Sequence, residues 1–123
     1  MISYANGSGI SLTLCSSCLI DSNTIRYSQK GISLSYSSSN TITGNTITHN
    51  TEYGVYLYQS SQNQFAHNVF TVNDQHVNDP CTNAWSIGQQ GNTWDDYQGY
   101  DNDSNGIGDT PYPIPGGSNQ DMF

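Results

Sequence analysis

The chain has 123 residues, enough for one domain, and carries a formal net charge of -8 with only two basic residues. Ser, Thr, Asn and Gln make up 51 of the 123 residues, and the residues that favour helices are scarce, which excludes an α-helical bundle. Two basic residues cannot neutralise a phosphate backbone, so we expect no nucleic-acid partner. No apolar run approaches the length of a membrane-spanning helix, so we expect no membrane insertion.

The N-terminal segment, residues 1–8, shows neither the basic patch nor the apolar stretch of a signal peptide. Either a signal peptide has been removed, or this chain is the C-terminal piece of a longer protein with a start codon added, and we favour the second interpretation. Under that interpretation, any export signal would lie in the upstream part.

A repeat organises the chain from residue 9 to residue 70. Its three copies open at Gly9, Gly31 and Gly54, which are 22 and 23 residues apart, and an Asn follows each Gly after fourteen residues. Alternating apolar and polar residues predict short strands, and Asn or Gly at the breaks predicts tight turns. One copy is too small to bury its own apolar face, but stacked copies can. The sequence predicts an all-β fold: a right-handed parallel β-helix of about four coils.

Stacking in this register predicts columns of equivalent side chains. The apolar columns are Ile10–Ile32–Val55, Leu12–Leu34–Leu57, Ile20–Ile42–Phe65 and Ile25–Ile47–Phe70, and a ladder of hydrogen-bonded amides is Asn23–Asn45–Asn68. A β-sandwich is the alternative, but hairpins would not preserve the same offsets over 22 residues.

The three cysteines are Cys15, Cys18 and Cys81, an odd number, and the first two form a C-x-x-C motif. No second pair completes a zinc site, and the βαβ pattern of redox C-x-x-C motifs is absent. We expect small side chains that fill a coil; a metal site and a disulfide remain as alternatives.

A degenerate copy runs from residue 77 to residue 94, where Trp85 and Trp94 replace aliphatic residues. Bulky rings are expected where a stack must be closed off from solvent. We therefore assign residues 1–94 to the coils and residues 95–123 to an irregular C-terminal cap.

The cap contains an acidic loop with oxygen-bearing side chains at every second position. Its candidate calcium ligands are Asp101, Asp103, Asn105, the backbone carbonyl of Ile107, and Asp109. Tyr112 stands where an EF-hand has its bidentate Glu, and no helical pattern flanks the loop, so a sensor hand is rejected. We expect one structural Ca²⁺, with Asp95 or Asp96 as a source of a further ligand.

With coils and tail together, the chain resembles the NosD-like, CASH-type right-handed parallel β-helix proteins of the pectin-lyase-like superfamily. The resemblance rests on GISL at 31–34, NTITGNTI at 40–47, GNTWDDY at 91–97 and DNDSNGIGDTPYPI at 101–114. It implies a secreted or cell-surface location, with the periplasm also possible, and the role that names the family is copper delivery to a periplasmic reductase. His49, His67 and His76 lie at unrelated repeat offsets, so we expect copper to be unlikely.

These residues bear on three candidate functions, namely catalysis, glycan binding and a structural role. Catalysis is disfavoured, because Arg26 and Lys30 are the only cations, and because Asp95 and Asp96, if on a strand, would point to opposite faces. Glycan binding is supported by four tyrosines at or beside outward positions, namely Tyr36, Tyr53, Tyr56 and Tyr58. We expect chiefly a structural module at the cell exterior. Because nothing before Gly9 resembles a cap, its first coil should stack on upstream coils or, head to tail, on another copy.

Overall fold

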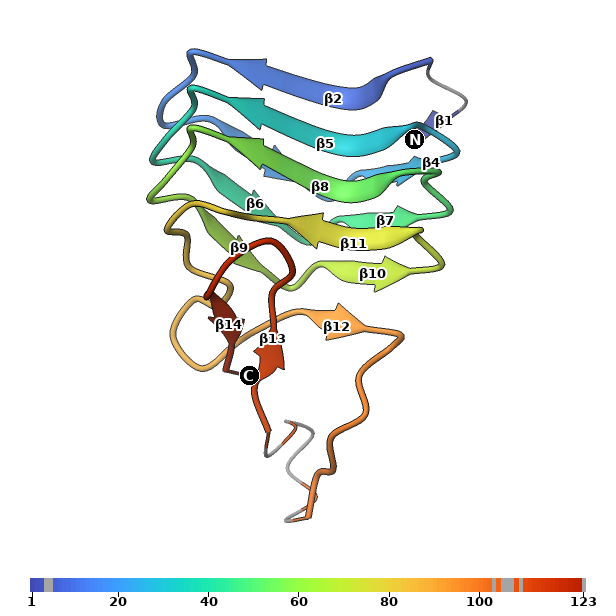
Figure 1. The fold of residues 1–123 in the computed structure, drawn as a ribbon, viewed down its shortest axis with the longest axis vertical. Helices are drawn as coiled ribbons and strands as arrows, with labels where there is room; N and C mark the ends of the chain where they lie inside the picture. The colour runs from blue at the N-terminus through green and yellow to red at the C-terminus, as the bar shows by residue number, and fades with distance from the viewer. Residues whose placement is uncertain (4–5, 103, 105–107, 109, 123) are drawn as a thin grey trace.

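The computed structural model describes residues 1–3, 6–102, 104, 108 and 110–122. In this part of the chain all regular structure is β, without helices, and the strands wind into a parallel β-helix of about four turns (Figure 1). The first coil lies at one end of the stack, and the irregular cap closes the other end (Figure 1). The predicted fold class is confirmed.

Three parallel sheets form the walls of the helix. One contains β2 (Ser8–Thr13), β5 (Lys30–Ser35), β8 (Tyr53–Tyr58) and β11 (Gln75–Asn78); the second contains β3 (Leu19–Asp21), β6 (Thr41–Thr43) and β9 (Gln64–Ala66). The third contains β1 (Ile2–Ser3), β4 (Thr24–Arg26), β7 (Thr46–Thr48), β10 (Val69–Thr71) and β12 (Thr93–Trp94). In the cap, β13 (Tyr112–Pro113) and β14 (Gln120–Asp121) pair antiparallel.

The pairing register places equivalent side chains one above another, as the repeat predicts. Ile10 pairs with Ile32 and Ile32 with Val55, and Val77 continues the same column. The column that contains Ile25 is longer than predicted, because Ile2 precedes it and Trp94 ends it. These apolar columns are buried along all three sheets. A chain with only 33% hydrophobic residues can therefore form a continuous core.

Aromatic rings close the C-terminal end of this core. Trp85 stacks on Phe65 at 4.0 Å between ring centroids, and Trp94 stacks on Phe70 at 4.4 Å. Tyr112 of the cap then stacks on the outer face of this second pair, 4.2 Å from Trp94. Flat rings are suited to this position, because they cover the last coil without needing a further coil above them.

Each complete coil turns at four corners, and each corner places one residue in the left-handed backbone region. These residues are Leu14, Ser17, Ser22 and Tyr27 in the first coil, Tyr36, Ser39, Gly44 and His49 in the second, and Gln59, Gln62, His67 and Val72 in the third. Each is followed directly by Asn, Ser or Cys. The corner is therefore a two-residue unit, in which a left-handed residue turns the chain and the next residue bonds to the adjacent coil.

Val72 is the corner residue least suited to this backbone. Its φ is 52° and its side chain is 59% exposed. A β-branched residue in the left-handed region lowers the stability of the fold by about 1–2 kcal/mol, because its side chain crowds the backbone. We expect Val72→Asn to raise the free energy of unfolding by about 1 kcal/mol, because Asn tolerates this conformation. Urea unfolding measures the change. Gly44→Ala, at φ 67°, is the opposite control and should destabilise; a less stable Val72→Asn protein would contradict the argument.

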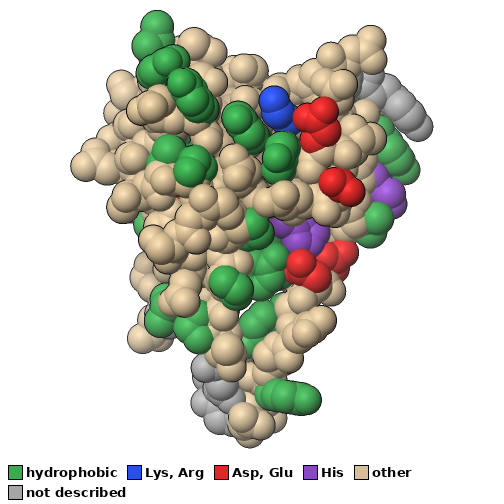
Figure 2. Space-filling model, viewed as in Figure 1, with side chains coloured by type: hydrophobic (Ala, Val, Ile, Leu, Met, Phe, Trp, Pro, Cys, Tyr) green, Lys and Arg blue, Asp and Glu red, His purple; other side chains and the backbone are tan. Residues whose placement is uncertain are grey.

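The surface is polar on the face formed by β2, β5, β8 and β11. Figure 2 shows acidic side chains gathered toward one side of this face, next to histidine, with few basic groups. This distribution agrees with the net charge of -8.

Candidate functional site

The inward polar residues form ladders that run along the stack. Asn68 is representative: its Oδ1 accepts hydrogen bonds from the backbone N and from Nδ2 of Asn45, both at 3.0 Å, and its Nδ2 donates to Asn92 Oδ1 at 2.9 Å. Asn23 donates in the same way to Asn45. The structure therefore places Asn23, Asn45 and Asn68 in one ladder and extends it to Asn92.

Three further ladders occupy the other corners. They are Asn40–Asn63–Asn83, Ser28–Asn50–Asn73 and Ser37–Ser60–Cys81. Sequence reasoning did not identify these ladders. The signal was present, because their members also recur at spacings of 20–23 residues.

All four ladders have the same direction: each backbone N–H donates to a side chain of the next coil, and each inner Asn Nδ2 donates both to the next coil and to a carbonyl of the preceding one. The last donors of a ladder therefore need an acceptor that lies outside the repeat. Asp121, which is 2% exposed, accepts at Oδ2 from Asn92 N at 2.7 Å, from Asn92 Nδ2 at 3.0 Å and from Trp94 Nε1 at 3.0 Å. A carboxylate suits this end, because it accepts several hydrogen bonds and donates none.

Asp79 ends two other ladders and is fully buried. Its Oδ1 accepts from Cys81 N at 3.0 Å and from Asn83 Nδ2 at 2.9 Å. Its Oδ2 accepts from Trp85 Nε1 at 2.8 Å and from Asn119 Nδ2 at 2.7 Å. One carboxylate thus joins the last coil to the cap.

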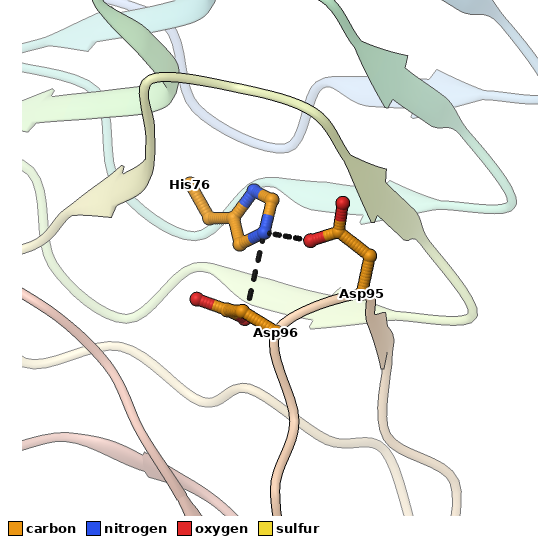
Figure 3. A group of neighbouring side chains, drawn as sticks. All are labelled: His76, Asp95 and Asp96. Atoms are coloured by element: carbon orange, nitrogen blue, oxygen red, sulfur yellow. Dashed lines mark hydrogen bonds and ion pairs between the residues drawn. The ribbon is translucent and has the colours of Figure 1, made fainter.

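The remaining ladder ends at His76, beside two carboxylates (Figure 3). His76 is 5% exposed; its Nδ1 lies 3.1 Å from Asn73 Nδ2, and its Nε2 lies 2.6 Å from Asp95 Oδ1 and 3.5 Å from Asp96 Oδ1. Tyr112 Oη donates to Asp96 Oδ2 at 3.2 Å. Burial and this hydrogen bond raise the pKa of Tyr112, so the phenol keeps its proton.

His76, Asp95 and Asp96 offer three potential metal-ligand atoms within 4.8 Å of one another, and no other such group occurs among the residues that the structure describes. The sequence argument that Asp95 and Asp96 point to opposite faces is wrong, because β12 ends at Trp94 and both follow it. Sequence reasoning missed the cluster, since His76 belongs to β11 and lies 19 residues before Asp95, with the degenerate copy between them.

Opposing influences act on Asp95. Partial burial raises its pKa, but hydrogen bonds from Val72 N–H and His76 favour the carboxylate, and the pKa lies below its ordinary value of 3.8. A lowered folded-state pKa stabilises the fold above the unfolded pKa, and this contribution is lost as the pH falls through the folded value. We expect Asp95→Asn to flatten the fall in Tm below pH 3.8. Melting curves from about pH 6 to pH 2 test this; an unchanged slope would contradict it.

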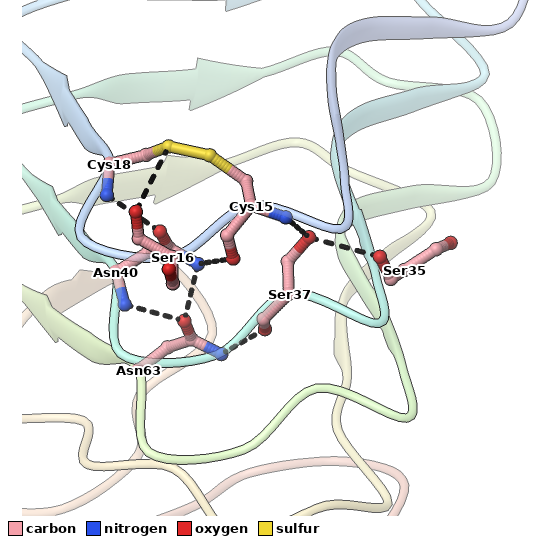
Figure 4. The surroundings of a disulfide bond; sticks show 7 residues. All are labelled: Cys15, Ser16, Cys18, Ser35, Ser37, Asn40 and Asn63. Carbon is pink, nitrogen blue, oxygen red and sulfur yellow. Dashed lines mark hydrogen bonds between the residues drawn. A yellow bond between two sulfur atoms is a disulfide. The ribbon is translucent and has the colours of Figure 1, made fainter.

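The structure joins Cys15 to Cys18 in a disulfide (Figure 4) and leaves Cys81 free. The expectation that Cys15 and Cys18 only fill space is therefore wrong, and the disulfide alternative holds. Their backbone N–H groups donate to Ser37 Oγ at 3.1 Å and Asn40 Oδ1 at 2.7 Å. The disulfide thus bridges the two corner positions that Ser37 and Asn40 occupy in the next coil.

The four candidate tyrosines form two pairs. Tyr36 and Tyr58 are 55% and 46% exposed and meet edge to face, with ring centroids 5.5 Å apart. Tyr53 and Tyr56 are half-buried and 5.3 Å apart, and Lys30 Nζ lies 4.4 Å from the Tyr56 ring centroid. The more accessible aromatic surface is therefore that of Tyr36 and Tyr58.

Of the candidate calcium ligands, Asp101 is described and exposed, whereas Asp103, Asn105, Ile107 and Asp109 lie outside the described residues. Tyr97 holds the two ends of this loop together. Its Oη donates to Thr110 O at 2.7 Å and accepts from Thr110 N at 3.2 Å. A Cβ at Gly99 or Gly108 would overlap this hydroxyl, so both glycines make room for the ring.

Comparison with known proteins gives a family. The family model described as "Periplasmic copper-binding protein (NosD)" matches residues 1–99. Proteins named "Probable ABC transporter binding protein NosD" from Stutzerimonas stutzeri and Pseudomonas aeruginosa are 37% and 39% identical to it over 62 residues. Each match covers 48% of this chain and 14% of the relative. No solved structure matches the chain.

The described residues include no helix that is long and apolar enough to cross a membrane. The chain spans 14% of the length of the curated relatives that it matches. The family match, in contrast, extends over all the coils and into the start of the cap. This chain belongs to the NosD family, whose members are described as periplasmic copper-binding proteins.

Proposed function

We propose that the chain is a non-catalytic, structural β-helix module of a periplasmic or otherwise exported NosD-family protein, and that it forms the closed end of a longer stack of coils. The family description supports the location. The observation that carries the structural role is the contrast between the two ends of the stack. Asp79, Asp121 and the stacked rings close the C-terminal end, whereas no strand of the described residues pairs with the outer edges of β2 and β3 in the first coil.

The outer edge of the first coil begins with β1, which lies over β4 as the last strand of a preceding coil. Among the described residues, no strand pairs with the outer edge of β2 or β3. Leu12 is half-buried, whereas its equivalent Leu34 is 0% exposed, and Leu14 and Leu19 are 80% and 64% exposed. Unpaired strands with apolar neighbours favour pairing with another strand. We propose that another coil of the same kind covers this edge.

The partner coil comes either from an upstream part of the polypeptide or from a second copy. The cap lies against the last coil (Figure 1), so a second copy would contribute its own first coil. That arrangement gives closed dimers instead of head-to-tail filaments.

Two measurements test the structural role. A chain extended before Met1 by one coil copied from residues 24–45 should melt at a higher temperature, because Met1 then takes the place of Thr46 and the added strands cover β2 and β3. Sedimentation over a range of concentrations should show any dimer of the original chain, and Leu19→Lys should abolish it, whereas Met122→Lys at the far end should not. An extended chain that melts no higher, together with a strictly monomeric original chain, would refute the proposal.

The proposal includes one structural Ca²⁺ in the loop that contains Asp101, Asp103, Asn105, Ile107 and Asp109. The ligand spacing and the hydrogen bond between Tyr97 and Thr110 support it. This bond holds the two ends of the loop together, and a loop with joined ends loses less entropy when it binds an ion. At a calcium concentration 100 times the Kd, we expect about 2.7 kcal/mol of added stability. Melting curves with calcium and with a chelator measure it, and Asp103→Ala should remove the difference. Equal melting temperatures for the original chain would refute the site.

Glycan binding is a second candidate, favoured by the exposure of Tyr36 and Tyr58 on neighbouring coils. Their rings offer an amphipathic surface for sugar faces. A soluble-glycan array should then show ligands whose binding is lost in Tyr58→Ala and weakened less in Tyr56→Ala, because the Tyr56 ring is half-buried beneath Lys30. An array without bound glycans would remove this candidate.

A further inference from the structure

The family description implies copper, which weighs against the expectation that copper is unlikely. The residues to test are His76, Asp95 and Asp96, because imidazole nitrogen and carboxylate oxygen are both ligands of Cu²⁺. A metal-bound histidine needs one ring nitrogen for the metal and a hydrogen-bond acceptor for the N–H on the other. The fit therefore depends on what faces Nδ1 of His76.

Nδ1 faces the side-chain amide of Asn73, whose orientation is set by three other bonds. Asn73 Oδ1 accepts from Asn50 N at 3.1 Å and from Asn50 Nδ2 at 2.9 Å. Asn73 Nδ2 donates one hydrogen to Ile47 O at 2.9 Å. Rotation of the amide by half a turn would break all three bonds. The second hydrogen on Nδ2 therefore points at His76 Nδ1, 3.1 Å away, and Nδ1 is an acceptor.

If Nδ1 accepts, the proton of the neutral ring is on Nε2. That nitrogen lies 2.6 Å from Asp95 Oδ1, the distance of a strong hydrogen bond to a carboxylate. A copper ion at Nε2 would move the proton to Nδ1, where it would face the N–H of Asn73. The arrangement therefore fits the end of a hydrogen-bond ladder and does not fit a metal ligand.

We infer that His76 is a positioning residue, held as the Nε2–H tautomer, and that it does not coordinate the copper implied by the family. It accepts the last donor of the ladder that contains Asn50 and Asn73, as Asp121 does for the ladder of Asn92. Its Nε2–H holds Asp95, whose Oδ2 accepts the N–H of Val72 at 2.7 Å. His76 thus joins the last full coil to the start of the cap.

The first test reads the tautomer directly. In nitrogen-15 NMR of the metal-free protein at neutral pH, His76 should show a protonated Nε2 and an unprotonated Nδ1. Addition of one equivalent of copper sulfate should leave Tm unchanged. A protonated Nδ1, or a copper-dependent rise in Tm that Asp96→Asn abolishes, would overturn the inference.

The second test uses two variants of His76 in the absence of metal. Gln has an acceptor and a donor side by side and can replace both ring nitrogens, whereas Ala leaves Asn73 and Asp95 without their partner. We expect His76→Ala to lower Tm by roughly 5–10 °C, and His76→Gln to lower it by less than half as much. If the two metal-free variants have the same Tm, the positioning role is refuted.

Discussion

Asp79→Asn is expected to lower the free energy of unfolding by about 3–5 kcal/mol, one of the two largest effects that we predict for a single substitution. The carboxylate is fully buried and accepts four N–H donors, two on each oxygen. Asn has nearly the same shape, but one of the two acceptor positions becomes an NH₂ group. In either orientation of the amide, two donors would face another donor.

Urea unfolding followed by tryptophan fluorescence measures this change, because Trp85 Nε1 is one of the four donors. Asp74→Asn is the matched control: it removes the same charge from an exposed position in the preceding turn, and its effect should stay within about 0.5 kcal/mol. If Asp79→Asn changes stability no more than this control, the idea that a carboxylate ends the ladders fails.

Asn68→Ala should cost about 3–5 kcal/mol, because Asn68 is the centre of a buried ladder. Removal of its amide leaves two donors of Asn45 without acceptors, and removes one donor each from Asn92 Oδ1 and Ile42 O. All of these groups lie between coils, where water does not replace the lost bonds.

Asn23→Ala is the control for Asn68→Ala, since Asn23 lies at the open end of the same ladder and is half-buried. There the loss should be about 1 kcal/mol, because solvent reaches the groups left behind. Chemical denaturation of both variants gives the two losses in the free energy of unfolding, which can then be compared. Equal losses at the two positions would show that burial of the ladder does not control its contribution.

The two ends of the stack therefore differ in chemistry. In every ladder the backbone N–H donors point toward the cap, so the last coil needs acceptors, and the chain provides Asp79, Asp121 and the His76–Asp95 pair. The first coil has no comparable cap among the described residues and ends in an unpaired strand. For a family whose curated members are much longer than this chain, this polarity is consistent with a module that terminates a stack at one end and extends it at the other.

The repeat made the fold predictable from the sequence. Gly9, Gly31 and Gly54 open copies that are 22 and 23 residues apart, and this nearly constant spacing determines which side chains lie above one another. The apolar columns and the ladder of Asn45 follow, because neighbours in a parallel solenoid are always one repeat apart. The other ladders were readable from the same spacing but were overlooked.

The periodic spacing of glycine, apolar and amide residues was enough to specify a stacked β-helix, since each coil is a template for the next. Only the folded chain reveals the ends of the ladders, because those contacts lie outside the repeat: Asp121 reaches Asn92 across 29 residues and Asn119 reaches Asp79 across 40. Spacing carries no information on such pairs. Their geometry depends on how the cap packs on the last coil, and so does the choice between hydrogen-bond acceptor and metal ligand at His76.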